Sequence, residues 1–233
     1  MRLHIPKLKT LVFLFSAFCF LLSAFGANAQ TAPQFLVSWK AQSYVPSWYQ
    51  GKIFPTNGSR IDVNFELIDN GKIADISKKV IRWYVNDELM KNEKNGLGIK
   101  SFSFNAADYP GKETEIRIAM PDYWDVPLDK IFIIPIVSPE VVIDAPYPSR
   151  RIPADRSSFL AYPFFFNIGN SNSLSFEWFV NDQSAKAGEN PSALNLNIDS
   201  TAPKGFAIDI KVVVKNLLNE MEFAGKNIKM EIK

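Results

Sequence analysis

The sequence predicts an all-β protein in which two antiparallel β-sandwiches follow an N-terminal signal peptide. Three observations predict it: an apolar leader, a seven-residue motif that recurs 95 positions later, and short segments in which apolar residues alternate with polar ones. The 204 residues that follow position 29 are enough for two domains of ordinary sandwich size.

Residues 1–29 have the composition of a secretory signal peptide. A basic start is followed by an uncharged stretch over residues 10–27 that is rich in Leu, Phe and Ala. Ala27 and Ala29 are the small residues that a signal peptidase accepts, so we expect Gln30 to be the first mature residue. The alternative is an uncleaved membrane anchor, because the uncharged stretch is close to the ~17–25 residues that span a bilayer.

The mature chain contains neither histidine nor cysteine, because His4 and Cys19 are the only residues of these types and both lie in the leader. It therefore has no disulfide, no thiol nucleophile, no Ser-His-Asp relay and no usual zinc or copper site. Export without disulfides is more typical of bacteria than of eukaryotes, so we interpret the source as bacterial. We predict a protein that is not an enzyme and has no catalytic residues, cofactor or metal.

Charge gives no indication of a nucleic-acid partner. After the leader, 23 basic and 24 acidic residues remain, a net charge of −1. A nucleic-acid surface needs a basic patch, and basic clusters here are limited to pairs such as Lys78-Lys79 and Arg150-Arg151. We expect no nucleic-acid partner, and membrane contact only through an uncleaved leader.

An internal repeat organises the mature chain. Residues 81–87, Ile-Arg-Trp-Tyr-Val-Asn-Asp, recur at 176–182 as Phe-Glu-Trp-Phe-Val-Asn-Asp, and this spacing indicates duplication of a whole domain. The first, third and fifth residues of each copy are apolar, which places Trp83 and Trp178 on the buried face of a strand. The Asn-Asp pair then tolerates the positive φ angles of a type I′ hairpin turn.

The other strands follow in the same order in both copies. Each copy has an opening strand, a strand before the Trp motif, an alternating strand after it, a second alternating strand beyond a proline-containing turn, and a last strand. The first copy places them at 35–41, 61–67, 81–85, 102–104, 116–120 and 131–137, and the second at 140–143, 159–168, 176–180, 194–198, 208–214 and 227–233. No segment has a convincing helical period, and 216–223 is a candidate for at most one helical turn.

About seven short strands per copy is the number found in immunoglobulin-like sandwiches. Proline ends a strand near Ser138-Pro139, so we place one sandwich at 30–138 and the other at 139–233. A core Trp in a strand that ends Val-Asn-Asp, then a proline-containing turn and an alternating strand that ends in Asn, resembles bacterial Ig-like and PKD-like domains. The resemblance implies a spacer, adhesive or assembly module of the cell envelope, without catalytic residues.

One candidate contact surface is the aromatic cluster of Tyr44, Trp48 and Tyr49 beside Pro46, in a predicted loop. Large aromatic rings there can stack on a sugar or anchor a protein partner. The alternative is that they pack, and close the open end of the first sandwich.

A second candidate loop contains Tyr123 and Trp124 together with Asp122, Asp125 and Asp129. A glycosidase needs a pair of carboxylates around a sugar, but here one loop supplies both without a cleft-forming fold. Calcium is an alternative ligand, although the Asp-x-Asp-x-Asp-Gly spacing of a calcium loop is missing. We therefore interpret the segment as a solvated connection between strands.

These patterns favour a non-catalytic exported protein that mediates protein contacts or spacing in a bacterial cell-envelope or surface assembly, such as a pilus, a secretion apparatus or an adhesin. The alternative is a carbohydrate-binding module that acts on cell-wall or extracellular glycan through Trp48, Tyr49, Tyr123 and Trp124. Glycan binding needs these rings in one flat exposed strip, whereas protein assembly can use a sheet edge. The expected location is the periplasm, the cell surface or the exterior.

Overall fold

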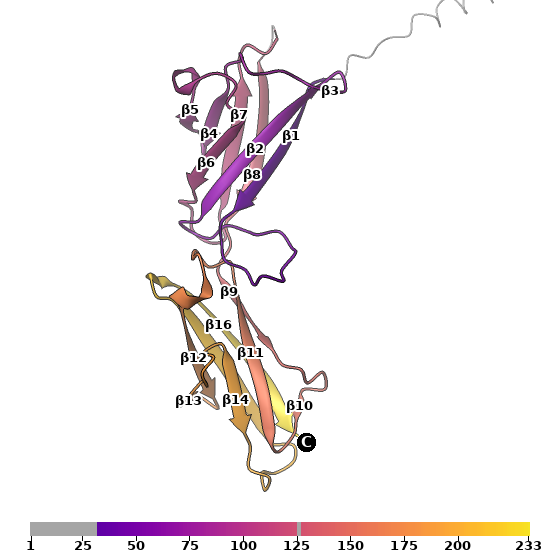
Figure 1. Ribbon diagram of the computed structural model, residues 1–233, viewed down its shortest axis with the longest axis vertical. Helices are drawn as coiled ribbons and strands as arrows, with labels where there is room; N and C mark the ends of the chain where they lie inside the picture. The colour runs from indigo at the N-terminus through magenta and orange to yellow at the C-terminus, as the bar shows by residue number, and fades with distance from the viewer. Residues whose placement is uncertain (1–31, 125–126) are drawn as a thin grey trace, which may run out of the picture. The chain divides into compact units, whose positions relative to one another are not determined.

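The computed structural model describes residues 32–124 and 127–233, which form two all-β sandwiches (Figure 1). The predicted signal peptide and Asp125 lie outside the described residues. No helix within these two ranges is long and apolar enough to cross a membrane.

The first sandwich has two sheets, and Phe65 of one contacts Trp83 of the other at 5.6 Å between ring centroids. In one sheet β1 pairs with β2, and β2 pairs with both β3 and β6. The other sheet has the order β5–β4–β7–β8. The strands are β1 (Gln34–Ala41), β2 (Arg60–Asp69), β3 (Lys72–Ile73), β4 (Arg82–Val85), β5 (Glu88–Lys91), β6 (Ser101–Asn105), β7 (Glu113–Met120) and β8 (Leu128–Pro135).

The second sandwich has a sheet of order β14–β11–β9 and a sheet of order β10–β16–β15–β12–β13. All pairs are antiparallel except β10–β16, which is parallel. Residues 34–135 and 140–232 thus each form an immunoglobulin-like antiparallel sandwich, which confirms the predicted fold class. The strands are β9 (Glu140–Asp144), β10 (Arg151–Ile152), β11 (Arg156–Phe164), β12 (Leu174–Val180), β13 (Gln183–Ala185), β14 (Ala193–Asn197), β15 (Ala207–Asn216) and β16 (Asn219–Ile232).

The two tryptophans of the repeat occupy matching core positions. Both indoles are almost fully buried, and each donates its N–H to a backbone carbonyl: Trp83 to Ile99 O at 2.9 Å and Trp178 to Pro191 O at 3.1 Å. Trp83 pairs with Ile118 on the neighbouring strand, and Trp178 pairs with Val212. The repeat is therefore a structural one.

The Asn-Asp turns also match. Asn86 and Asp87 have φ angles of 47° and 65°, and Asn181 and Asp182 have 49° and 62°. These are the left-handed values that a type I′ turn requires, and Asn and Asp tolerate them better than most residues. In each copy the Asn side-chain oxygen accepts a 2.9 Å hydrogen bond from a neighbouring strand, from Glu115 N in the first and from Asp209 N in the second.

One prediction was wrong at 216–223, where the chain forms a strand hairpin and no helical turn. β15 runs to Asn216, a turn follows at Leu217-Leu218, and β16 starts at Asn219. The Asn216 side-chain oxygen accepts from Leu218 N at 2.8 Å, and its amide donates to the buried Glu222 at 2.5 Å. Asn side chains that bond to nearby backbone in this way compete with helix formation.

The strand expected at 159–168 ends earlier, at Phe164. Phe165 has a φ of 61°, a left-handed conformation that interrupts the strand and is uncommon for a bulky residue. Its N–H donates to Tyr44 O at 2.7 Å, a hydrogen bond that helps to hold this backbone.

Candidate functional site

The segment between β1 and β2, which carries Tyr44, Trp48 and Tyr49, packs at the end of β11. Tyr44 forms an antiparallel bridge with Phe166: Tyr44 N donates to Phe166 O at 2.7 Å, and Phe165 N donates to Tyr44 O at 2.7 Å. All these residues belong to the larger of two compact units in the chain, Phe35–Glu66 with Asp75–Lys233. Backbone hydrogen bonds therefore fix the position of the segment.

Ring contacts add to this anchoring. Tyr49 contacts Phe164 with a centroid distance of 5.4 Å, and Trp48 contacts Tyr162 at 5.2 Å with the ring planes 85° apart. Tyr44 and Tyr49 are half-buried, whereas Trp48 keeps 56% of its surface exposed. Among the three predicted aromatic residues, Trp48 is the one whose ring is open to a ligand.

Two clefts, each of 590 Å³, lie beside Trp48 and Tyr162 and share both residues as lining. One is lined only by uncharged residues, among them Tyr44 and Ser47. The other includes the charged residues Asp144, Arg150 and Lys229. The same pair of rings therefore borders two chemically different surfaces.

Tyr123 and Trp124 stack on each other with a centroid distance of 5.6 Å, and Trp124 is 42% exposed. They follow the end of β7 at Met120. The Trp48 segment approaches the other end of the same hairpin, where Val137 N donates to Pro55 O at 2.9 Å. Because β7 has eight residues, roughly 26 Å of strand, at about 3.3 Å per residue, separates the Pro55 contact from the start of the loop that carries Tyr123 and Trp124. The structure does not bring them into one strip.

The carboxylates of this loop do not form a common site among the described residues. Asp129 lies 4.0 Å from an Arg117 nitrogen, and the Asp122 carbonyl accepts from Lys79 Nζ at 3.3 Å. Asp125 lies outside the described residues. Nowhere in 32–124 and 127–233 do three or more Asp, Glu, His or Cys residues gather closely enough to hold a metal ion.

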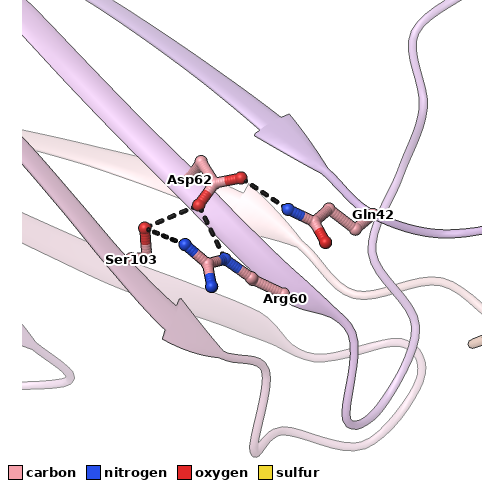
Figure 2. A network of polar contacts seen from close by, with 4 residues as sticks. All are labelled: Gln42, Arg60, Asp62 and Ser103. Atoms are coloured by element: carbon pink, nitrogen blue, oxygen red, sulfur yellow. Dashed lines mark hydrogen bonds and ion pairs between the residues drawn. The ribbon is translucent and has the colours of Figure 1, made fainter.

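A polar network fixes the start of the Trp48 segment (Figure 2). The Asp62 carboxylate accepts hydrogen bonds from Ser103 Oγ at 2.6 Å, Arg60 Nε at 2.9 Å and Gln42 Nε2 at 2.9 Å. These bonds, led by the one from Ser103, lower the pKa of Asp62 from 3.8 to about 2, because they favour the ionised form. Gln42 is the first residue after β1, so the network ties the segment to β2 and β6.

A surface that was not predicted from the sequence lies on the outer face of the sheet β5–β4–β7–β8. A row of paired residues crosses it: Leu89 with Tyr84, Tyr84 with Arg117, and Arg117 with Ile131. The Arg117 guanidinium lies 3.8 Å from the centre of the Tyr84 ring. Leu89, Ile131 and Ile133 are 45%, 52% and 51% exposed, so the row is flanked by open apolar side chains.

A sequence signal for this surface was present at 131–137, where nearly every residue is apolar. In a strand with one solvated face, apolar and polar residues alternate. Apolar residues on both faces of a strand are typical of strands that are covered on both sides. Phe132 and Ile134 point toward the core, and Ile131 and Ile133 point outward.

The second sandwich has the same row with different residues. Ser184 pairs with Phe179, Phe179 with Lys211, and Lys211 with Asn227. Lys211 lies 5.7 Å from the centre of the Phe179 ring, so the pairing of a cation with an aromatic ring is repeated. Polar residues replace the apolar flanks: Ser184 stands in the place of Leu89, Asn227 in that of Ile131, and Lys229 in that of Ile133.

The edges of these two sheets also differ. In the second sandwich β10 pairs with the end of β16, through Arg151 with Glu231 and Ile152 with Ile232. In the first, β8 is an edge strand, and within the described ranges no strand pairs with its outer side. The open edge and the apolar face therefore occur together in the first sandwich.

The chain matches no protein-family model, and no curated protein matches its sequence. Among solved structures it is similar to the fibronectin(III)-like modules of CbhA from Clostridium thermocellum, with 13% identity over 84% of this chain and 93% of that chain and a TM-score of 0.27. It is similar to three N-terminal domains of the Highly Immunogenic Outer Capsid protein of bacteriophage RB49, with 11% identity over 86% and 59% of the two chains and a TM-score of 0.41.

A third similarity is to SGBP-B of the mixed-linkage glucan utilization locus of Bacteroides ovatus, with 9% identity over 84% of this chain and 47% of that chain and a TM-score of 0.24. The chain spans less than two thirds of the length of these last two proteins. At such identities and TM-scores, the similarities carry no argument about function.

Proposed function

We propose that the protein is an exported, non-catalytic component of a bacterial cell-envelope or surface assembly, of the Ig-like and PKD-like kind, and that it binds a protein partner through the first sandwich. The observation that carries the proposal is the difference between the two sheets of the repeat. Ile131, Ile133 and Leu89 are exposed in the first, where the second has polar residues in the same places.

The backbone of β8 supports an extended strand as the occupant. Ile136 N donates to Lys112 O and Ile136 O accepts from Gly111 N, so Ile136 turns toward the β7 side. Every second residue of a strand turns the same way, which directs the N–H and C=O groups of Ile131 and Ile133 to the open edge. A partner strand can pair there, and Tyr84 with Arg117 offers the residue types that dominate binding energies.

The test uses matched substitutions in the two sandwiches. The double variant Ile131→Thr, Ile133→Thr keeps β-branched residues in the strand, and Asn227→Thr, Lys229→Thr is its control. The immobilised mature protein is incubated with native envelope extract, and bound proteins are identified by mass spectrometry. We expect one partner to bind the wild type and the control, and its purified form to bind the double variant at least tenfold more weakly.

A proline substitution tests the mode of binding. Ile133→Pro removes an N–H that faces the open edge and leaves the bonds to β7 intact, as Pro135 already does two residues later. We expect it to weaken the partner more than Ile133→Thr does. Equal affinity for wild type, Ile133→Pro and the double variant would overturn the proposal.

The export and non-catalytic parts have their own tests. Intact mass of envelope material is expected to correspond to a chain that begins at Gln30, and a chain that retains Met1 would indicate the anchor instead. The purified mature protein is expected to turn over no glycan, peptidoglycan or peptide substrate. Turnover that disappears in Asp122→Asn or Asp129→Asn would contradict a non-catalytic role.

A further inference from the structure

We infer that the uncharged cleft beside Trp48 is a binding site for a neutral saccharide, a site separate from the β8 surface of the proposed function. The cleft has a volume of 590 Å³, within the roughly 300–1,000 Å³ typical of small-molecule sites. Its walls come from the Trp48 segment, from β11 and β12, from the short 3-10 helix Ser171–Ser173 and from the turn at Asn190, all in the same compact unit.

The chemistry of the lining selects the class of ligand. None of the 15 lining residues carries a charge. The lining combines four aromatic residues, Trp48 and Tyr162 among them, with hydroxyl and amide side chains such as Ser171 and Asn172. Aromatic rings present an apolar face, and hydroxyl and amide groups both donate and accept hydrogen bonds. A sugar without charge offers the matching C–H faces and hydroxyl groups.

The polar groups of the cleft are available to a ligand. Asn190 Oδ1 accepts from the N–H and the hydroxyl of Ser192, and these bonds leave the Asn190 amide N–H groups unused. The side chains of Ser47, Ser171 and Asn172 form no hydrogen bond to any residue that the structure describes. A ligand in the cleft therefore gains these hydrogen bonds without breaking internal ones.

The cleft is also organised before a ligand binds. The Tyr44–Phe166 bridge holds one side of the Trp48 turn, and Tyr49 N donates to Pro46 O at 2.9 Å within it. Tyr162 supports the indole edge-on at 5.2 Å, while 56% of Trp48 stays exposed. Little ordering of the segment is then needed on binding, and preorganisation of this kind improves affinity.

The second cleft at Trp48 is less suitable for a neutral sugar than the uncharged cleft. Its lining includes Asp144, Arg150 and Lys229, whose desolvation by a neutral ligand is unfavourable. Apart from Tyr147 and Tyr162, its lining has no residue with a hydroxyl or amide side chain. A neutral saccharide is therefore better matched by the cleft at Ser171 and Asn190.

The test is calorimetric titration of the mature protein with cellotetraose, maltotetraose and chitotetraose as three neutral probes. We expect at least one to bind, and binding to fall at least tenfold in Trp48→Ala and measurably in Asn172→Ala. Tyr109→Ala is the control, because it removes a 76% exposed aromatic ring outside the cleft and is expected to leave affinity unchanged. Affinity is also expected to be the same at low and high salt, since no charge lines the cleft.

Circular dichroism establishes that each variant is folded before titration. No binding of the three probes, or equal binding by wild type and Trp48→Ala, would overturn the inference. The Ile131→Thr, Ile133→Thr variant is expected to bind the sugar normally. Failure of the saccharide site is thus distinguishable from failure of the proposed protein contact.

Discussion

Trp83 and Trp178 lie in matching positions, each followed by an Asn-Asp turn, but the sheets that contain them face solvent with different side chains. In the first sandwich Leu89, Tyr84, Arg117 and Ile131 cross the outer face, and in the second Ser184, Phe179, Lys211 and Asn227 do so. Core and turn residues are fixed by packing and backbone geometry in both copies. The outer faces have no such constraint, and the two copies differ there.

The other pair of sheets shows the same division. Inward residues correspond, since Val63 pairs with Phe102 in the first sandwich and Phe159 with Leu194 in the second. The outward pair Asp62 and Ser103 belongs to the polar network (Figure 2). In the second sandwich the outward pair is Ser158 and Asn195, which provides no charge. The two copies therefore differ in charge at this pair of positions although they fold alike.

The largest loss of stability is expected for the two core tryptophans, which the sandwiches have in common. Trp83→Ala and Trp178→Ala each leave a cavity in a core where the indole is almost fully buried, and each is expected to destabilise its sandwich by about 3–5 kcal/mol. Urea unfolding followed by circular dichroism measures both. Trp48→Ala is the control, with a much smaller loss because Trp48 is half-exposed. A small loss for one core Trp alone would break the structural equivalence of the copies.

A buried carboxylate in the second sandwich is expected to have the next effect. Glu222 accepts from Asn167 N at 2.7 Å and from the Asn216 amide at 2.5 Å, and it is only 6% exposed. Glu222→Ala leaves both donors without their partner, which costs about 1–3 kcal/mol. The unfolding free energy is measured for Ala and Gln variants, and Gln, which can still accept, is expected to lose less. No loss in either variant would show that water replaces the carboxylate.

Matched turn variants sharpen the comparison at a smaller scale. Asn86→Ala and Asn181→Ala remove a side-chain hydrogen bond and place alanine at a φ near 48°, so each is expected to cost about 1–2 kcal/mol. Glycine tolerates the angle and lacks only the hydrogen bond, so Asn→Gly is expected to cost less at both sites. Thermal unfolding of the four variants measures this, and a loss confined to one turn would mean that the turns are not equivalent.

The features that the two sandwiches share are easier to predict from the sequence than the features in which they differ. Trp83 and Trp178, the turns after them and most strands follow from alternation and turn chemistry, which are local. The end of β11 does not follow from local sequence. Phe165 has a left-handed backbone conformation and donates a hydrogen bond to Tyr44, more than a hundred residues earlier in the chain. The hairpin at Leu217-Leu218 depends on Glu222 meeting Asn167, also distant in sequence.

The candidate site is less predictable for the same reason. The aromatic residues around Trp48 stand out in the sequence, but their neighbours Tyr162, Ser171 and Asn190 become neighbours only through the fold. Ile131 and Ile133 lie in an ordinary apolar run, and their exposure depends on which face of β8 is turned away from the core. The predicted domain boundary at 138/139 and the five predicted contact residues stay predictions.

The smallest effect is expected at Asp62, where the two copies differ in charge. Its pKa is about 2 in the folded protein, below the ordinary value of about 3.9 for an unfolded chain. The ionised carboxylate therefore stabilises the fold above about pH 4, and this contribution is lost as the pH falls toward 2. Exposed ion pairs and hydrogen bonds contribute about 0–1 kcal/mol, so the change in melting temperature is small.

Asp62→Asn is expected to lower the melting temperature at neutral pH and to match the wild type near pH 2. Ser158→Ala, at the corresponding position of the second sandwich, is expected to leave the pH profile unchanged. If the difference in melting temperature between wild type and Asp62→Asn were the same across this pH range, the charge of Asp62 would not be what holds Gln42 and the Trp48 segment to β2.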